Sequence, residues 1–263
     1  MMKFVVIALA CVVAYAAAQD EIQLGCQKGD MDANCKFTDQ KDWAYMVFVE
    51  SWPGTFCDDN CCQLPADVTT NPPGFTMHGM WPNYEGKEYP SCCTSPYKRQ
   101  DMLDSIMNDK ELKFALDYNW PSLKRCKFVL YESEKHGTCA STVYNGTKGY
   151  LDYWEAAMTL LRRYDLAAAL KKNGIVPSTT AFYTEAQIKA VIEPLIGAKV
   201  NLHCATGNNK RLSEVRICIK RPTNAAEKKN PVPFDCPRLE SSCNAKHVEL
   251  PPLKVLKTGT CRD

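Results

Sequence analysis

The sequence has 263 residues, with 32 lysines and arginines against 30 aspartates and glutamates, so its formal net charge is only +2. A protein that holds nucleic acid mainly through its overall charge is usually far more basic, so the composition excludes that class of binder. The length suits one sizeable domain that can bury a hydrophobic core.

The first segment has the pattern of a secretory signal peptide. A positive residue is followed by an apolar run over residues 4–14, and Ala16 and Ala18 give the small-residue spacing of a cleavage site. We expect residues 1–18 to be removed and residues 19–263 to form one domain. An uncleaved membrane anchor is the alternative, although the apolar run is too short to span a bilayer with a margin.

The cysteines support an oxidising compartment. One of the 15, Cys11, lies within the predicted signal peptide, which leaves an even number in the mature chain. Disulfide bonds are their expected use in a protein outside the cytosol. A structural zinc site is the alternative, but the adjacent pairs Cys61-Cys62 and Cys92-Cys93 are poor chelates, and the sequence has no Cys-x-x-Cys repeat.

The first half of the mature chain predicts two strands and a helical region. Residues 43–49 are rich in strand-forming side chains, and residues 75–77 form a shorter run of the same kind. Residues 63–74 contain three prolines and are predicted to be a loop. Residues 97–118 have apolar side chains at helical spacing, in one helix or two.

The second half predicts two further strands and two helices. Residues 126–132 form an apolar run that we expect to be a strand, and residues 212–219 alternate as a strand does. Residues 150–172 predict a long amphipathic helix, and residues 184–192 open with a capping box and precede a proline. Residues 221–237 predict an exposed loop. The elements follow no regular βαβ order, so we expect an α+β fold, with a central, mostly antiparallel sheet flanked by helices in one disulfide-rich domain.

Two of the four histidines lie in unusual surroundings. His78 lies in the segment FTMHGMWPN and His136 in YESEKHGTC, and each follows a predicted strand and precedes a glycine. Imidazole can hold or release a proton near neutral pH, Lys135 can supply a fixed cation, and Glu132 can orient a neighbour or tune its pKa. This set suits acid–base chemistry on a phosphodiester. Two buried structural histidines are the alternative.

The same two segments resemble the active-site segments of the ribonuclease T2 family, which typically have the forms His-Gly-Leu-Trp-Pro and His-Glu-Trp-x-Lys-His-Gly-Thr-Cys. The likeness extends over residues 43–253 and is strongest to plant-type members. The resemblance implies an endoribonuclease that cleaves single-stranded RNA as a transient substrate. It implies secretion, or delivery to a vacuole or lysosome through the secretory pathway, and we expect a monomer without a membrane partner.

The resemblance also implies a role for each motif residue. His136 would be the general base on the 2′-hydroxyl, and His78 the general acid for the leaving oxygen. Lys135 and Glu132 would stabilise the phosphorane-like state. The product would be a 2′,3′-cyclic phosphate that is then hydrolysed to a 3′-phosphate. No metal or other cofactor is implied, because the nucleophile belongs to the substrate.

One departure from the family pattern affects substrate binding. Tyr131 stands where the family often has a third histidine that binds phosphate, and Ser133 stands where a tryptophan often follows the glutamate. A tyrosine can still donate a hydrogen bond to a phosphate oxygen, so we expect activity with weaker binding or a shifted pH profile. A binding or storage protein without catalysis is the alternative.

Contacts to the bases follow from the resemblance as well. Trp81, Asn83 and Tyr89 match a family site where a base stacks on aromatic rings and is recognised by a carboxylate or amide. Core packing is the alternative for Trp81. A second base site often uses a glutamine near the first Trp-Pro, where this chain has Glu50 or Ser51.

The resemblance suggests the disulfide pairs Cys62–Cys126, Cys93–Cys139, Cys204–Cys243 and Cys218–Cys236, with Cys57–Cys61 and Cys26–Cys35 as further pairs. A bond between Cys93 and Cys139 would tie the two active-site segments together. Asn145 begins a glycosylation sequon in a chain that we expect to be secreted. We expect His203 and His247 to be structural or surface residues.

Overall fold

The computed structural model describes residues 42–86, 88–124, 128–207, 209–238 and 240–257. The predicted signal peptide and the predicted Cys26–Cys35 bond lie outside the described residues. None of the helices in the described ranges combines the length and the apolar character needed to cross a membrane.

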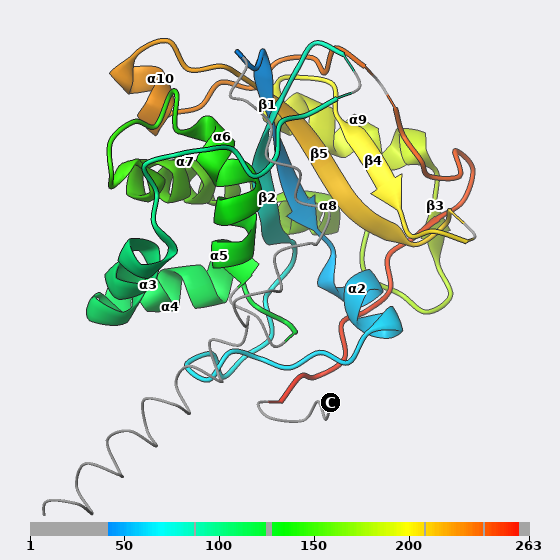
Figure 1. The fold of residues 1–263 in the computed structure, drawn as a ribbon. Helices are drawn as coiled ribbons and strands as arrows, with labels where there is room; N and C mark the ends of the chain where they lie inside the picture. Colours follow the sequence, from blue (N-terminus) through cyan, green and yellow to red (C-terminus); the bar gives the residue numbers. More distant parts are fainter. Residues whose placement is uncertain (1–41, 87, 125–127, 208, 239, 258–263) are drawn as a thin grey trace, which may run out of the picture.

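A four-stranded antiparallel sheet forms the centre of the molecule (Figure 1). In spatial order its strands are β2 (Thr76–Asn83), β1 (Tyr45–Ser51), β5 (Leu212–Lys220) and β4 (Asn201–Cys204). A separate two-stranded sheet is made by β3 (Phe182–Tyr183) and β6 (Val248–Glu249). The expected α+β fold with an antiparallel sheet is therefore confirmed. Strand β4 was not predicted.

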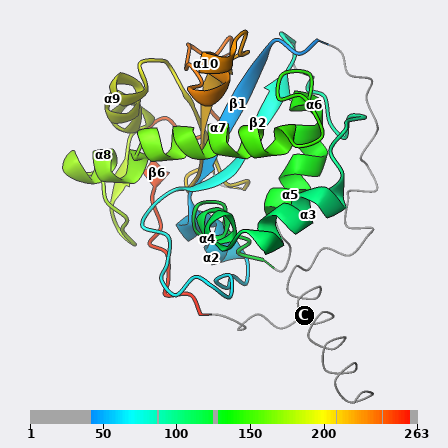
Figure 2. The ribbon, with the colours of Figure 1, turned by 90° about the vertical axis from the view of Figure 1, so that its left-hand side faces the viewer.

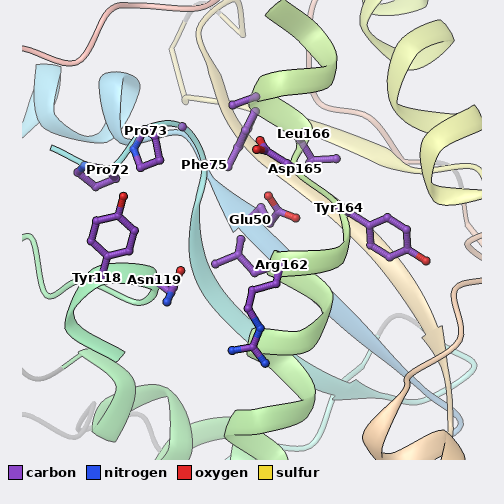
Figure 3. Close-up of a pocket in the computed structure, with 13 residues that line it drawn as sticks. Glu50, Pro72, Pro73, Phe75, Tyr118, Asn119, Arg162, Tyr164, Asp165 and Leu166 are labelled. Atoms are coloured by element: carbon purple, nitrogen blue, oxygen red, sulfur yellow. The ribbon is translucent and has the colours of Figure 1, made fainter. Parts of the chain in front are cut away.

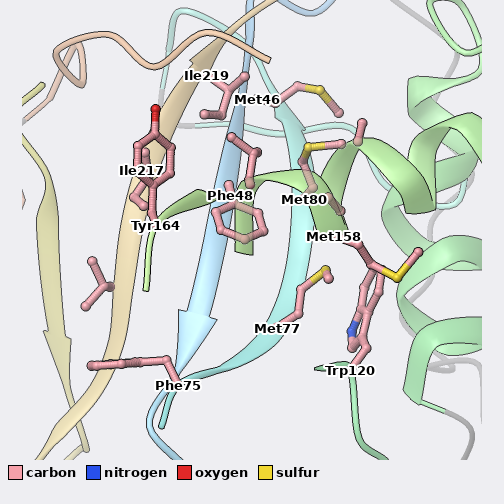
Figure 4. Close-up of a cluster of buried hydrophobic side chains, with 14 of the residues drawn as sticks. Met46, Phe48, Phe75, Met77, Met80, Trp120, Met158, Tyr164, Ile217 and Ile219 are labelled. Carbon is pink, nitrogen blue, oxygen red and sulfur yellow. The ribbon is translucent and has the colours of Figure 1, made fainter. Parts of the chain in front are cut away.

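Helices cover one face of the sheet and one of its edges. They are α2 (Pro53–Asp59), α3 (Arg99–Asn108), α4 (Lys110–Asn119), α5 (Phe128–Glu132), the π-helical turn η1 (Ser133–Gly137), α6 (Thr138–Ala140), α7 (Gly149–Arg163), α8 (Leu166–Lys172), α9 (Glu185–Ile196) and α10 (Ala225–Lys229). The long helix α7 lies across β1 and β2 (Figure 2). The core forms between them, where Phe48, Met77 and Ile217 of the sheet meet Met158 and Trp120 (Figure 4).

The strand predicted over residues 126–132 is wrong, because the described part of this segment is helical. Helix α5 continues into η1 and α6, and its buried residues include Val129, Leu130, Ser133 and His136. This spacing places them on one helical face. A short apolar run fits a buried strand or a buried helix equally well, so the letters FVLY did not separate the two.

Two smaller differences concern the ends of elements. The predicted loop over residues 221–237 contains the short helix α10. Helix α9 continues past Pro194 and ends at Gly197, which has a left-handed φ of 76°. A proline near the end of a helix removes a single hydrogen bond, and the buried side chain of Ile196 keeps the last turn on the core.

Three expected disulfides are present, namely Cys93–Cys139, Cys204–Cys243 and Cys218–Cys236. The expected pairs Cys62–Cys126 and Cys57–Cys61 are wrong, because Cys57 is bonded to Cys62. The chain turns back after α2 and brings the Cα atoms of this pair to 5.5 Å. Cys61 and Cys92 are disulfide-bonded as well.

Candidate active site

His78 lies at an irregularity in the pairing of β1 with β2. Val49 pairs with Gly79, whereas the next residue of β1 pairs with Met77, so His78 is an extra residue in β2. Such a bulge changes the direction of the side chains that follow it. It brings His78 and Trp81 together although they are three positions apart, with ring centroids 4.9 Å from each other. The sequence predicted that His78 follows a strand, but His78 lies within β2.

Two buried aromatic side chains hold the backbone of β2 at this bulge. The indole Nε1 of Trp120 donates a hydrogen bond of 2.8 Å to the carbonyl oxygen of His78. The hydroxyl of Tyr153, from α7, donates one of 2.6 Å to the carbonyl of Met80. The position of His78 is therefore fixed from the core side of the sheet.

His136 lies in the π-helical turn η1. Such turns are rare and occur frequently at functional sites. The turn is fixed by α7, because the indole of Trp154 donates a hydrogen bond of 2.8 Å to the hydroxyl of Ser133. That hydroxyl donates in turn to the carbonyl of Val129, at 2.6 Å. The Cys93–Cys139 bond attaches the next turn to the loop before α3.

Both histidine rings lie against one indole. The ring of Trp81 is 4.9 Å from that of His78, at 86°, and 5.1 Å from that of His136, at 32°. The exposed ring of Tyr89 has its centroid 5.8 Å from that of His136, and the ring of Phe128 has its centroid 5.2 Å from that of His78. Trp81 is half-buried and belongs to this row of rings rather than to the hydrophobic core.

Glu132 connects the two motif segments. Its Oε2 accepts a hydrogen bond of 2.7 Å from the indole of Trp81, and its Oε1 lies 3.6 Å from Nε2 of His78. The bond passes over Gly79, where an added Cβ would lie 2.3 Å from Nε1 of Trp81. The glycine after His78 therefore makes room for the side chains of Trp81 and Glu132.

The other expected substrate contacts lie next to these residues. Nζ of Lys135 donates a hydrogen bond of 3.1 Å to the hydroxyl of Tyr131. This leaves the proton of the Tyr131 hydroxyl available for another acceptor. The amide of Asn83 donates one hydrogen bond of 2.8 Å to the carbonyl of Trp81, on its own strand.

Sequence reasoning missed an ion pair on β5. Nδ1 of His78 donates a hydrogen bond of 2.7 Å to Oε1 of Glu214. Arg216 donates to the other oxygen of this carboxylate from Nε and Nη2, at 2.9 and 2.7 Å, and lies over the ring of Trp81. Alternation along β5 indicates a polar face, but nothing in the sequence says that this face meets His78. His203, on β4, pairs with Glu214 across the sheet.

The surroundings push the pKa values of the two imidazoles apart. Burial lowers the pKa of His136 to about 3, assisted by the charges of Lys135 and His78. Burial also lowers the pKa of His78, but the bond to Glu214 and the charge of Glu132 outweigh it, so the net shift is upward. Near neutral pH the ring of His136 is therefore a free base, while the ring of His78 is stabilised in its protonated form.

The two carboxyl groups near His78 also differ. Burial raises the pKa of Glu132 to about 7, against the charges of His78 and Lys135 and the bond from Trp81. Burial acts in the same direction on Glu214, but the bond and charge of His78, together with Arg216, lower its pKa to about 2. Glu214 is therefore ionised throughout the neutral range.

Of the two candidates for a second base contact, Glu50 faces away from the histidines. It lies on the core side of β1, is 1% exposed, and lines a cavity of about 150 Å³ together with Tyr118 and Asp165 (Figure 3). Neighbouring residues of a strand point to opposite faces, so Ser51 lies on the other side, where it pairs with Glu214.

The remaining candidates lie outside this cluster. His247 stacks on Phe182 and bonds Oε1 of Glu249 at 2.7 Å, at the second sheet. Asn145 is exposed in the turn before α7. Within the described ranges, no group of three or more His, Cys, Asp or Glu side chains is arranged to hold a metal ion.

Comparisons with known proteins first identify the class. The fold matches the crystal structure of RNase NT in complex with 5′-AMP with a TM-score of 0.64 and 28% identity, covering 81% of this chain and 100% of that one. Extracellular ribonuclease LE of Solanum lycopersicum is 32% identical over 192 residues, or 68% of this chain and 77% of the relative. Ribonuclease DdI of Dictyostelium discoideum is 29% identical over 206 residues, or 77% of this chain and 82% of the relative.

A match to a family model then identifies the family. Residues 43–236 match the model of the Ribonuclease T2 family. The chain belongs to this family, and it is an endoribonuclease.

Proposed function

We propose that the protein cleaves single-stranded RNA by metal-independent acid–base transphosphorylation, through 2′,3′-cyclic phosphates to 3′-phosphate ends. The observation that carries this proposal is a pair of imidazoles that both lie against the ring of Trp81, with pKa values shifted in opposite directions. Such a pair provides a base and an acid at the same pH.

In the first step, neutral His136 removes the proton of the 2′-hydroxyl. The 2′-oxygen attacks the phosphorus, and the bond from phosphorus to the 5′-oxygen breaks. Protonated His78 delivers the proton of Nε2 to the leaving 5′-oxygen, because its Nδ1 is used by Glu214. The products are a 2′,3′-cyclic phosphate and a free 5′-hydroxyl. No metal-bound water is required, since the attacking oxygen belongs to the RNA.

The second step reverses the roles of the two rings. His78, now neutral, takes a proton from water as the water oxygen attacks phosphorus. His136, now protonated, gives its proton to the 2′-oxygen as the bond from that oxygen to phosphorus breaks, which leaves a 3′-phosphate.

Charge on the phosphorane-like state is stabilised by the groups beside the histidines. The ammonium of Lys135 supplies a positive charge, and the hydroxyl of Tyr131, which accepts from Lys135, has its proton free for a phosphate oxygen. The pKa of Glu132 is raised to about 7, so the carboxyl group can be protonated or ionised near neutral pH. The protonated carboxyl donates a hydrogen bond, and the ionised carboxylate stabilises the protonated form of His78.

The bases of the substrate bind on the row of rings. Trp81 and the exposed ring of Tyr89 offer stacking surfaces, and the amide of Asn83 has a second hydrogen and an oxygen for a base edge. RNase NT, similar in fold, was crystallised with 5′-AMP.

The test is digestion of single-stranded RNA by the purified protein in the presence of EDTA, with product ends identified by mass spectrometry. We expect cyclic phosphates that convert to 3′-phosphates. His78→Ala and His136→Ala should each lower the rate by orders of magnitude with little loss of stability. His247→Ala, which removes a histidine from the second sheet, is the matched control. Activity close to wild type in His136→Ala, or complete loss with EDTA, would contradict the proposal.

We further propose that residues 1–18 are removed on secretion or on delivery to a vacuole or lysosome, that Asn145 is glycosylated, and that the mature protein is a monomer without a membrane partner. The signal-peptide pattern, the disulfides and the exposure of Asn145 support this. The intact mass of protein from the culture medium, before and after glycosidase treatment, tests the first two points. Light scattering after gel filtration tests the third.

A further inference from the structure

His78 and Glu214 meet across the central strand of the sheet. Val49 of β1 pairs with Gly79 on one side and with Arg216 on the other, and Ser51 pairs with Glu214. The two side chains therefore come from strands that flank β1, on the face that is opposite the α7 core. They meet as Nδ1 and Oε1 at 2.7 Å, although 136 positions separate the residues.

We propose that Glu214, held by Arg216, is a positioning residue that fixes the ring orientation and tautomer of His78 and favours its protonated form. This inference rests on the proposed function, in which His78 is the general acid. With Nδ1–H donated to Glu214, the proton available for the leaving oxygen is on Nε2, which faces Glu132 at 3.6 Å.

Arg216 fixes the carboxylate in turn. It donates two hydrogen bonds to Oε2 of Glu214, which leaves Oε1 for His78. The Glu214 side chain is only 12% exposed, so water competes little for these bonds. The planar guanidinium also lies 5.4 Å from the ring centroid of Trp81. The carboxylate is thus linked through Arg216 to the ring that both histidines contact.

The two imidazoles differ in this respect. Nδ1 of His136 is buried and has no hydrogen-bond partner in the part of the chain that the structure describes. A ring with a carboxylate on Nδ1 is stabilised when protonated, whereas a buried ring without one is stabilised when neutral. Glu214 therefore creates the difference that a paired acid and base require.

Other charged groups also face His78, and they limit the expected effect. Glu132 approaches from α5, Arg216 from β5, and His136 lies beyond Trp81. His203 lies across from Glu214 on β4. Because Glu132 also favours the charged ring, loss of Glu214 should weaken the preference for the protonated form without removing it.

Glu214→Gln tests the role of the charge. Arg216 requires an acceptor, so the glutamine oxygen will face Arg216 and its amide N–H will face Nδ1 of His78. An N–H donor at Nδ1 opposes protonation of the ring. We expect kcat on a dinucleotide to fall about 10- to 100-fold near neutral pH, KM to change less than about threefold, and the alkaline limb of kcat/KM to move to lower pH.

Two further variants separate charge from position. Arg216→Met removes a positive charge that disfavours protonated His78, so the alkaline limb of kcat/KM for this variant should move to higher pH. Its kcat should fall, because the Glu214 carboxylate is no longer held in orientation. Glu249→Gln is the matched control, because it breaks another histidine–glutamate pair of 2.7 Å, with His247, and should leave the profile unchanged. If the limbs of Glu214→Gln and Arg216→Met coincide with that of wild type, the inference is wrong.

A titration of histidine ring signals by NMR requires no activity and distinguishes the two proposals. We expect the pKa of His78 to be lower in Glu214→Gln than in wild type. An unchanged His78 titration in folded protein would overturn the positioning role even if the wild type cleaves RNA. An inactive wild type with the expected titration would instead refute the proposed function. If Glu214→Gln does not fold, the direction of the shift in Arg216→Met decides.

Discussion

The indole Nε1 of Trp81 donates a hydrogen bond of 2.7 Å to Oε2 of Glu132. The tryptophan belongs to the first motif and the glutamate to the second, so this bond joins the two segments inside the site. It holds the carboxylate beside Nε2 of His78 and fixes the indole that both histidine rings contact. One hydrogen bond thus sets the position of a residue from each motif.

The first prediction concerns the glycine beneath this bond. In Gly79→Ala the new Cβ would lie 2.3 Å from Nε1 of Trp81 and 2.5 Å from Oε2 of Glu132, so both groups, or the backbone that carries the Cβ, must shift. We expect kcat/KM on a dinucleotide to fall about 100-fold, because displacement of reacting groups by about an ångström has effects of this size. Gly86→Ala is the control, since apart from its chain neighbours no atom of the described residues lies within 4 Å of its added Cβ. A rate for Gly79→Ala similar to that of the control would contradict the argument.

The second prediction concerns the donor behind His78. Trp120→Phe leaves the carbonyl of His78 without its indole partner, which should cost about 1–3 kcal/mol of stability in urea unfolding. The loss should also lower kcat, because this bond holds the bulge that directs the imidazole. Trp52→Phe removes a similar bond, to the carbonyl of Pro251 at 2.7 Å. This control should lose stability while kcat stays near wild type, and an equal loss of kcat in both variants would show that the bulge is not involved.

The third prediction concerns pH. In the proposed reaction His136 is neutral and His78 is protonated, so kcat/KM should rise as His136 loses its proton near pH 3 and fall as His78 loses its proton at a pH above the ordinary imidazole value of 6.5. Glu132 also titrates, near pH 7, and would contribute to the same part of the profile. Glu132→Gln removes that contribution, so the alkaline limb that remains reports His78. Rates measured from roughly pH 3 to 9 check this. An acid limb near pH 6 would mean that His136 is not the buried neutral base.

The sequence predicted the identity of the motif residues better than the elements that carry them. His78, Glu132, Lys135 and His136 were predicted from local strings, and the structure brings them together. The strand expected before His136 is a helix, because an apolar run alone does not distinguish the two. The function of the segment did not depend on this error, since a helix and a strand can both deliver a fixed side chain.

Relationships that depend on strand order could not be predicted. Glu214 reaches His78 only because β2 and β5 both flank β1, and an alternating strand gives no indication of its neighbours. The partner of Cys62 was wrong for a similar reason, since two adjacent cysteines point in different directions and the turn after α2 decides which one meets Cys57. Local patterns specify residues and their spacing, while pairing is decided by the three-dimensional arrangement.

The last prediction concerns a residue that the proposed reaction does not use. Glu50 is buried on the core side of β1, and its Oε1 has no hydrogen-bond partner among the described residues. Burial raises the pKa of Glu50 well above its ordinary value of 4.5, and the charge of Asp165 adds to this shift. Glu50 therefore binds its proton more tightly in the folded chain than in the unfolded chain.

The sign of the effect on stability follows from this difference. Below the unfolded pKa both states are protonated, and the contribution of Glu50 is fully present. As pH rises above about 4.5 the unfolded state releases the proton first, so the free energy of unfolding falls by up to about 1.4 kcal/mol per pH unit until folded Glu50 ionises. Glu50→Gln cannot ionise and should lack this fall. In urea unfolding from roughly pH 4 to 8, the variant should gain stability over wild type as pH rises. The control Glu155→Gln, at an exposed carboxylate, should not gain stability over wild type as pH rises. Parallel curves of unfolding free energy against pH for Glu50→Gln and wild type would mean that Glu50 ionises alike in the folded and unfolded states.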